Sequence, residues 1–210
     1  MRRGRIELGL TLRRRAPPFI YYLFFTMPSS RPHWPTLWAA FLLVFATTLH
    51  GLSAEDNDIK NHPVLKYFLG SWTGEGELKG KDGNVITIKE EWKGQAASAN
   101  TLTIEGKHDI NGDQHGFEWT VIRNAATGAF ESNFRPNTNS GDTQHYEMVF
   151  SEADLRVQST TILPDGNTKL EITETVLGKD HDQIESKITL SDGSGEVLLS
   201  GVVKHRKAKE

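Results

Sequence analysis

The sequence predicts an all-β protein: an antiparallel up-and-down barrel of about ten strands, with one short N-terminal helix and a signal peptide ahead of it. Three observations lead to this prediction. Turn-forming residues recur roughly every ten to fifteen residues after Ala54, the segments between them alternate apolar and polar residues, and no long crossover separates them. Short turns join antiparallel neighbours, and closing the sheet removes its aggregation-prone edges.

The first 54 residues are predicted to direct export. They hold seven arginines against one acidic residue, and the apolar run 37–49 is shorter than the ~20 residues of a membrane span. We expect residues 27–54 to be a signal peptide cleaved after Ala54, which leaves Glu55 as the first residue of a periplasmic or extracellular protein. Leu52 is large for a cleavage site, so an uncleaved membrane anchor over residues 37–54 is the alternative. We expect contact with a membrane only through such an uncleaved N-terminal segment.

Residues 1–26 are interpreted as an over-extended start. A separate apolar block, residues 19–25, precedes Met27, and we take Met27 as the true start. A longer two-part leader that begins at Met1 is the alternative.

The exported part of the chain is acidic. Without residues 1–54 it has 17 basic and 26 acidic residues, a net charge of about −9, and its basic residues cluster only near the tail 206–210. Nucleic acid is therefore not an expected partner. Cysteine is absent, which excludes thiol catalysis, disulfides and thiolate metal sites.

A short helix is predicted over 62–69, after a linker at 55–61 and at the start of a barrel domain spanning 62–205. Asn61 or His62 can cap it, Pro63 suits its first turn, and Gly70 can end it in the left-handed conformation. Its apolar face is wide enough to cover one end of a barrel.

Nine turn signals divide the rest of the chain into ten strands. They lie at 81–84, 92–95, 110–113, 124–128, 136–141, 151–154, 164–167, 178–181 and 191–195. At about ten strands a barrel is wider than its side chains fill, since about eight strands are just filled or hold one small ligand. We therefore expect an internal cavity.

The stretch Gly70-Ser71-Trp72-Thr73-Gly74-Glu75-Gly76, which follows the predicted helix, resembles the Gly-x-Trp entry motif of calycins, the superfamily of the lipocalins. The fuller Gly-x-Trp-x-Gly-x-Gly form is similar to nitrobindin-like ten-stranded barrels and to related secreted bacterial lipocalin-like domains of unknown function. The resemblance implies that Trp72 closes one end of the barrel under a basic side chain of the last strand, for which Lys204 and Arg206 are the candidates. Gly70, Trp72, Gly74 and Gly76 form this predicted barrel-closing motif.

Nitrobindin-like proteins bind haem through a histidine near the C-terminus. His205 lies near that place, but the neighbouring pattern does not match, so no cofactor is predicted.

Polar residues in phase with the inward apolar faces are the candidates for a ligand cavity, together with three aromatic residues. The set consists of Glu90, Trp92, Asn100, His115, Trp119, Arg123, Tyr146 and Glu174. Ser132, Ser159 and Ser186 add inward hydroxyls. A mainly apolar cavity with a few convergent polar groups is typical of a small-molecule site. The alternative is that His115 and Arg123 reach water at strand ends, while the two glutamates pair with basic neighbours.

The segment His108-Asp109-Ile110-Asn111-Gly112-Asp113-Gln114-His115 has the composition of a metal loop but not the spacing of one. We interpret it as a solvated Asn-Gly turn and predict no metal site.

The predicted function is binding of a hydrophobic or amphipathic small molecule by an exported barrel. One alternative is an isomerase, cyclase or hydrolase that uses Glu90, His115, Arg123 and Glu174. Another is an envelope interaction module with a filled interior. No nucleophile with an identifiable base emerges, so catalysis is the less favoured interpretation.

Overall fold

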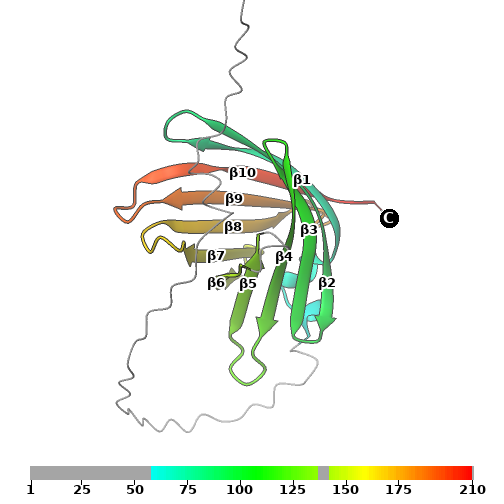
Figure 1. Ribbon diagram of the computed structural model, residues 1–210. Helices are drawn as coiled ribbons and strands as arrows, with labels where there is room; N and C mark the ends of the chain where they lie inside the picture. Colours follow the sequence, from blue (N-terminus) through cyan, green and yellow to red (C-terminus); the bar gives the residue numbers. More distant parts are fainter. Residues whose placement is uncertain (1–57, 137–141, 210) are drawn as a thin grey trace, which may run out of the picture.

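The computed structural model describes residues 58–136 and 142–209, so the predicted leader, signal peptide and cleavage site lie outside it. Ten antiparallel strands form one closed barrel in which each strand pairs with its neighbours in sequence and β1 pairs with β10 (Figure 1). The strands are β1 Gly70–Gly80, β2 Val85–Ser98, β3 Thr101–Ile110, β4 Asp113–Arg123, β5 Phe130–Arg135, β6 Gln144–Ser151, β7 Arg156–Ile162, β8 Lys169–Leu177, β9 Gln183–Ser191 and β10 Val197–Lys207. The predicted ten-stranded up-and-down barrel is confirmed.

One predicted turn is wrong. Residues 92–95 lie inside β2, and β2 and β3 are joined instead at Ala99 and Asn100. Gly94 marks a close approach of two backbones: a Cβ there would lie 2.9 Å from the carbonyl carbon of Phe68. The glycine therefore admits the helical segment to the barrel end.

The helix predicted over 62–69 is a short 3-10 helix, η3 Leu65–Phe68, and a second one, η2 Ile59–Asn61, lies in the predicted linker. Nδ1 of His62 accepts hydrogen bonds from the backbone N–H groups of Val64 and Leu65, at 3.2 and 3.1 Å, although the N-cap residue of η3 is Val64 and not His62 as predicted. Pro63, which has no N–H, and Gly70, whose φ is +104°, limit this helical segment to a few residues. Such a short segment closes with the tighter i→i+3 bonds.

The helical turns close one end of the barrel, as the cyan segment in Figure 1 shows beside β2. Ile59 is fully buried and donates its N–H to the Ala99 carbonyl, so this residue of the predicted linker at 55–61 is part of the barrel core. Phe68 stacks on Trp92 with ring centroids 6.4 Å apart, and Trp92 stacks on Trp72 at 5.4 Å. These aromatic rings form the floor of the barrel, which we define as Phe68, Trp72 and Trp92.

The basic side chain over Trp72 belongs to Lys207, whose Nζ lies 5.7 Å from the ring centroid. Lys204 and Arg206, the residues named from the resemblance, are exposed on the outer face. Successive strand residues face opposite sides, and Lys207 has the inward parity of the buried Val203. β10 therefore extends two residues beyond the predicted boundary at 205, into the predicted tail.

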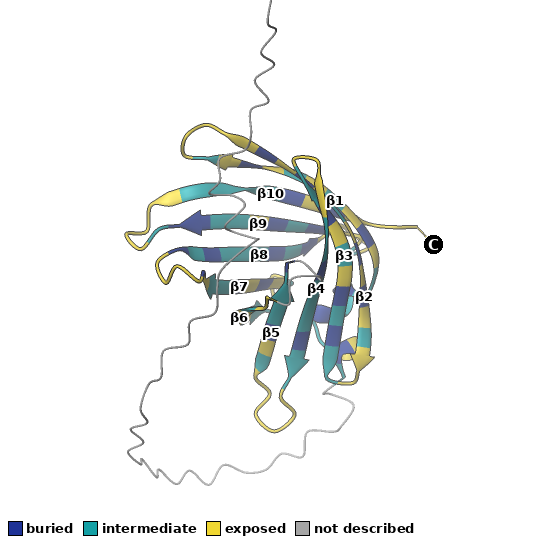
Figure 2. Cartoon of the chain, viewed as in Figure 1, coloured by how far each residue is buried: buried dark blue, intermediate teal, exposed yellow. Residues whose placement is uncertain are grey.

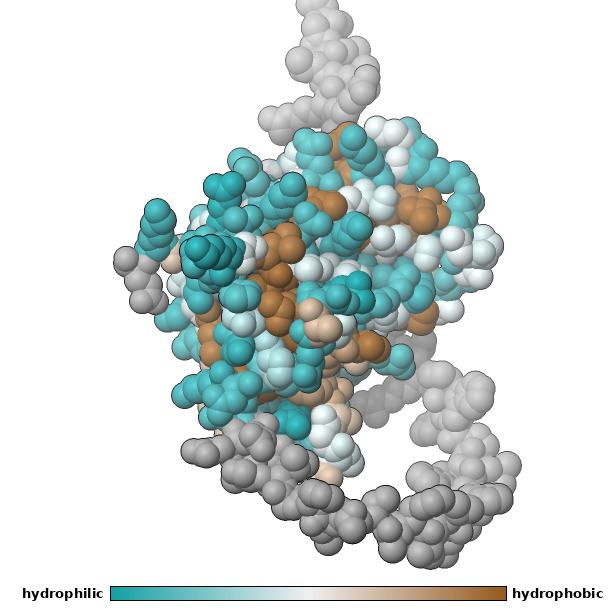
Figure 3. All heavy atoms as spheres, turned by 180° about the vertical axis from the view of Figure 1, so that it is seen from behind, coloured by the Kyte–Doolittle hydropathy of each residue, from teal (hydrophilic) through white to brown (hydrophobic). Residues whose placement is uncertain are grey.

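Buried residues line the inner face of the strands, whereas exposed residues gather at the turns and on the outer face (Figure 2). The outer surface in Figure 3 is mostly hydrophilic, with scattered apolar side chains. The large exposed apolar residues are Val85, Val149, Ile162, Leu177 and Val197. In the described part of the chain, no helix has the length and apolar character needed to cross a bilayer.

Candidate functional site

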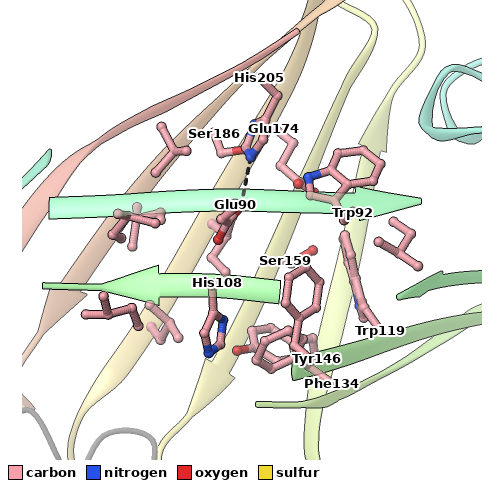
Figure 4. A pocket seen from close by; sticks show the side chains of 18 of the residues that line it. Glu90, Trp92, His108, Trp119, Phe134, Tyr146, Ser159, Glu174, Ser186 and His205 are labelled. Atoms are coloured by element: carbon pink, nitrogen blue, oxygen red, sulfur yellow. Dashed lines mark hydrogen bonds and ion pairs between the residues drawn. The ribbon is translucent and has the colours of Figure 1, made fainter. Parts of the chain in front are cut away.

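A cavity of about 150 Å³ lies inside the barrel above the aromatic floor. Most of its walls are aliphatic and aromatic side chains, but six polar residues also face it from six different strands (Figure 4). These are Glu90 on β2, His108 on β3, Ser159 on β7, Glu174 on β8, Ser186 on β9 and His205 on β10. Because they sit at separate places in the sequence, only closure of the barrel brings them together.

Five residues of one pairing row cross the wall from β10 to β4. The register places His205 opposite Gly74, Gly74 opposite Glu90, Glu90 opposite His108, and His108 opposite His115. The row begins near the floor, where the His205 ring lies 5.7 Å from that of Trp92, and ends beside the β3–β4 turn. Since strands in a barrel are tilted to its axis, one such row changes height along the wall.

Gly74 allows His205 and Glu90, its two neighbours in this row, to meet. A Cβ at Gly74 would overlap the imidazole of His205 and lie 2.6 Å from its Nε2. With no side chain in the way, the imidazole crosses β1 and its Nε2 contacts Glu90 Oε2 at 2.8 Å (Figure 4). His205 Nδ1 lies 3.5 Å from the Ser186 hydroxyl on the other side. Gly74 thus has a role in the site as well as in the barrel-closing motif.

Glu174 is the most perturbed acid of the cavity. Burial raises its pKa to about 7, an effect that the neighbouring Glu90 reinforces, while His205 and a hydrogen bond with Ser186 act in the opposite direction. Its Oε2 atom is buried and has no hydrogen-bond partner, and the same holds for Oγ of Ser159 on the adjacent strand. Buried polar atoms without partners are costly, so each such atom needs an explanation.

Other polar groups that line the cavity interact with their neighbours. Burial lowers the pKa of His108, although the Glu90 carboxylate opposes that effect. The Tyr146 hydroxyl donates to Gln144 at 3.1 Å, and burial raises the pKa of that hydroxyl. The Trp119 indole donates its N–H to the Ser132 hydroxyl at 2.5 Å.

Of the eight residues proposed from the sequence, five line the cavity: Glu90, Trp92, Trp119, Tyr146 and Glu174. Asn100 and Arg123 lie instead at the helical end of the barrel, where the Asn100 side chain donates to the Arg123 carbonyl at 3.2 Å. The Arg123 guanidinium lies 5.8 Å from the Phe130 ring. Burial, together with the smaller effect of the Arg123 charge, lowers the pKa of His62 to about 4.

His115 is also outside the set of lining residues. Its ring lies 6.0 Å from that of His108, close to the Asn-Gly turn at Asn111 and Gly112. Its parity is inward, as predicted, but the tilt of β4 carries it toward the barrel end opposite the helical turns. In place of His115 and Arg123 the structure brings in two residues that sequence reasoning did not select, His108 and His205. Both have the parity of buried apolar neighbours, Ile104 and Val203, and that signal could have identified them.

The residues present do not fit a haem. Both ring nitrogens of His205 face polar partners, and a cavity of this volume is the size that holds benzene, far smaller than a porphyrin. Within the described ranges, no group of three or more His, Asp or Glu side chains could hold a metal ion.

No protein-family model matches the chain, and no curated protein matches its sequence. Solved structures show similar barrels at low sequence identity. The S-type phycobiliprotein lyase CPES from Guillardia theta is 9% identical with a TM-score of 0.48, over 69% of this chain and 90% of that one. Rv2717c from M. tuberculosis is 14% identical, also with a TM-score of 0.48, over 69% and 95% of the two chains.

A redesigned β-barrel, mFAP0, whose structure was solved with DFHBI bound, is 15% identical with a TM-score of 0.34, over 67% of this chain and 99% of that one. Likenesses of this degree do not assign a ligand. The fold and the cavity themselves define a closed ten-stranded antiparallel barrel with an internal, partly polar cavity. This is the architecture that the calycin resemblance implies.

Proposed function

We propose that this protein binds a small molecule with a hydrophobic or amphipathic body inside the barrel. The observation that carries the proposal is the cavity itself, an apolar space with a few convergent polar groups, one of which has a strongly raised pKa. Apolar walls favour binding by removing ligand surface from water, and the polar groups orient the ligand.

The cavity volume sets the size of the ligand. At about 150 Å³ the space holds a single-ring molecule, and apolar cavities of this size are known to bind benzene. A single aromatic or short aliphatic body fits, whereas a long acyl chain requires movement of the walls.

Export remains part of the proposal. The arginine-rich, apolar N-terminus supports it, and N-terminal sequencing of the mature protein tests it, with Glu55 as the expected first residue. A mature chain that still begins before Ala54 would favour the anchored alternative.

Native mass spectrometry of protein purified from its own source tests binding most directly. We expect a co-purified small molecule, released on unfolding, that raises the mass of the folded chain. The space beside Ser159 provides a matched control: Ser159→Trp should fill the cavity and remove the added mass, while Thr73→Trp on the outer face should leave it unchanged. A native chain without added mass that also binds no single-ring compound would overturn the proposal.

Catalysis is the second candidate, because Glu90 and His205 form a hydrogen-bonded acid-base pair in the cavity. If a substrate is found, Glu90→Gln should abolish turnover and Glu91→Gln, one residue along on the outer face, should preserve it. Equal turnover in the two variants would exclude this role.

A further inference from the structure

Two residues that line the cavity each have a buried side-chain oxygen atom without a hydrogen-bond partner. These atoms are Oε2 of Glu174 and Oγ of Ser159, in residues whose exposed fractions are 8% and 1%. The register of β7 and β8 pairs Val157 with Glu174 and Ser159 with Ile172, so the two oxygens belong to diagonal neighbours on one part of the wall. Figure 4 shows both residues bordering the same space.

Apart from its two histidines, the ionisable side chains that line the cavity are all acids. Glu90 and Glu174 line it, and among the described residues no lysine or arginine does. The two histidines do not reverse this balance: His205 Nε2 is already engaged by Glu90, and burial favours the neutral form of His108. A ligand anion would therefore meet carboxyl groups with no fixed cation to neutralise its charge, and burying an unpaired charge is costly.

We propose that the cavity selects ligands that carry a hydrogen-bond donor, above all a primary ammonium group, on a small apolar body, and that it rejects carboxylates. The donor lies against Oε2 of Glu174 and Oγ of Ser159, and the apolar body occupies the space between the aromatic walls. This inference rests on the proposed function, because it names the ligand class of the same cavity.

The preference has a physical cause. A carboxylate surrounded by apolar walls holds a proton near neutral pH, because its charged form lacks solvation. A bound ammonium group replaces that solvation with a charge-assisted hydrogen bond, one of the stronger hydrogen bonds in proteins. The groups that interact with Glu174 from β2, β10 and β9 are Glu90, which raises its pKa, and His205 and Ser186, which lower it.

Three single-ring probes of similar size test the inference: toluene, benzylamine and benzoate, titrated into the full chain by calorimetry. We expect benzylamine to bind about tenfold or more tightly than toluene, since hydrogen bonds to charged groups are stronger than those between neutral groups, and benzoate to bind more weakly than either. Benzylamine affinity should rise between about pH 5 and about pH 8 as Glu174 ionises, benzoate affinity should fall, and toluene affinity should stay constant.

Glu174→Gln identifies the recognising group. It should reduce the preference for benzylamine over toluene to near unity and leave toluene binding intact, which also shows that the barrel is folded. Glu171→Gln is the matched control, because Glu171 lies on the same strand but pairs with Lys169 and Gln158.

The outcomes separate the two proposals. Toluene binding with no advantage for benzylamine, or an advantage that survives in Glu174→Gln, would overturn the ligand class and leave the proposed function standing. Failure of all three probes to bind would overturn the ligand class, and together with a native chain that carries no added mass it would overturn the proposed function as well.

Discussion

Replacing Glu174 with glutamine should change how the stability of the protein depends on pH. In the unfolded chain this carboxyl group has its ordinary pKa of 4.5, whereas burial in the barrel raises the pKa to about 7. Below pH 4.5 both states hold the proton. Between the two values the unfolded state releases it while the folded state keeps it, so the free energy of unfolding falls as pH rises, and above pH 7 the loss is complete.

The magnitude follows from the difference between the two pKa values. At about 1.4 kcal/mol for each pKa unit, the rise from 4.5 to about 7 corresponds to about 3 kcal/mol of stability lost between about pH 4 and about pH 8. Glutamine keeps the shape of the side chain but does not ionise. As the pH rises over that range, the free energy of unfolding of Glu174→Gln should therefore increase by about 3 kcal/mol relative to that of the wild type.

Urea unfolding at the two pH values measures this quantity. The comparison must be between variant and wild type, because two histidines also make stability depend on pH. His62 and His108 have lowered pKa values, so they reduce the free energy of unfolding as the pH falls. Any cost of burying the amide is the same at both pH values and cancels. A relative stability that changes by less than about 1 kcal/mol would show that Glu174 titrates almost normally, and the account of the site would be wrong.

Two further substitutions test the barrel-closing motif. Gly74→Ala places a methyl group against the His205 imidazole, and we expect it to cost about 1–3 kcal/mol and to separate His205 from Glu90, which histidine NMR shifts would report; unchanged shifts would refute the role given to Gly74. Lys207→Ala should cost about 0.5–1 kcal/mol through loss of the cation over Trp72, and Lys204→Ala, on the outer face, less than about 0.5 kcal/mol; equal urea midpoints would contradict this assignment.

The strand count and the end-closing segment could be predicted from the sequence, because both depend on local patterns. Alternation and turn residues specify which side chains face inward, and Trp72 and the helical segment occupy the barrel end that the motif indicates. The error at residues 92–95 has a local cause as well. Glycine serves both turns and close backbone contacts, and only the position of Phe68 against Gly94 decides between them.

The composition of the candidate site required the tertiary structure. Parity alone places Glu90, His115 and Glu174 inside, but it does not give their height along a tilted wall or their neighbours on other strands. The tilt moves His115 to the barrel end and brings His205 to Glu90 across Gly74.

The sequence by itself thus determined the type of barrel and the inward face of each strand, because neighbouring residues encode both. Only the tertiary structure decided which inward residues surround one cavity and which of their polar atoms lack partners. Those properties depend on closure between β1 and β10 and on contacts between residues as distant in sequence as Glu90 and His205.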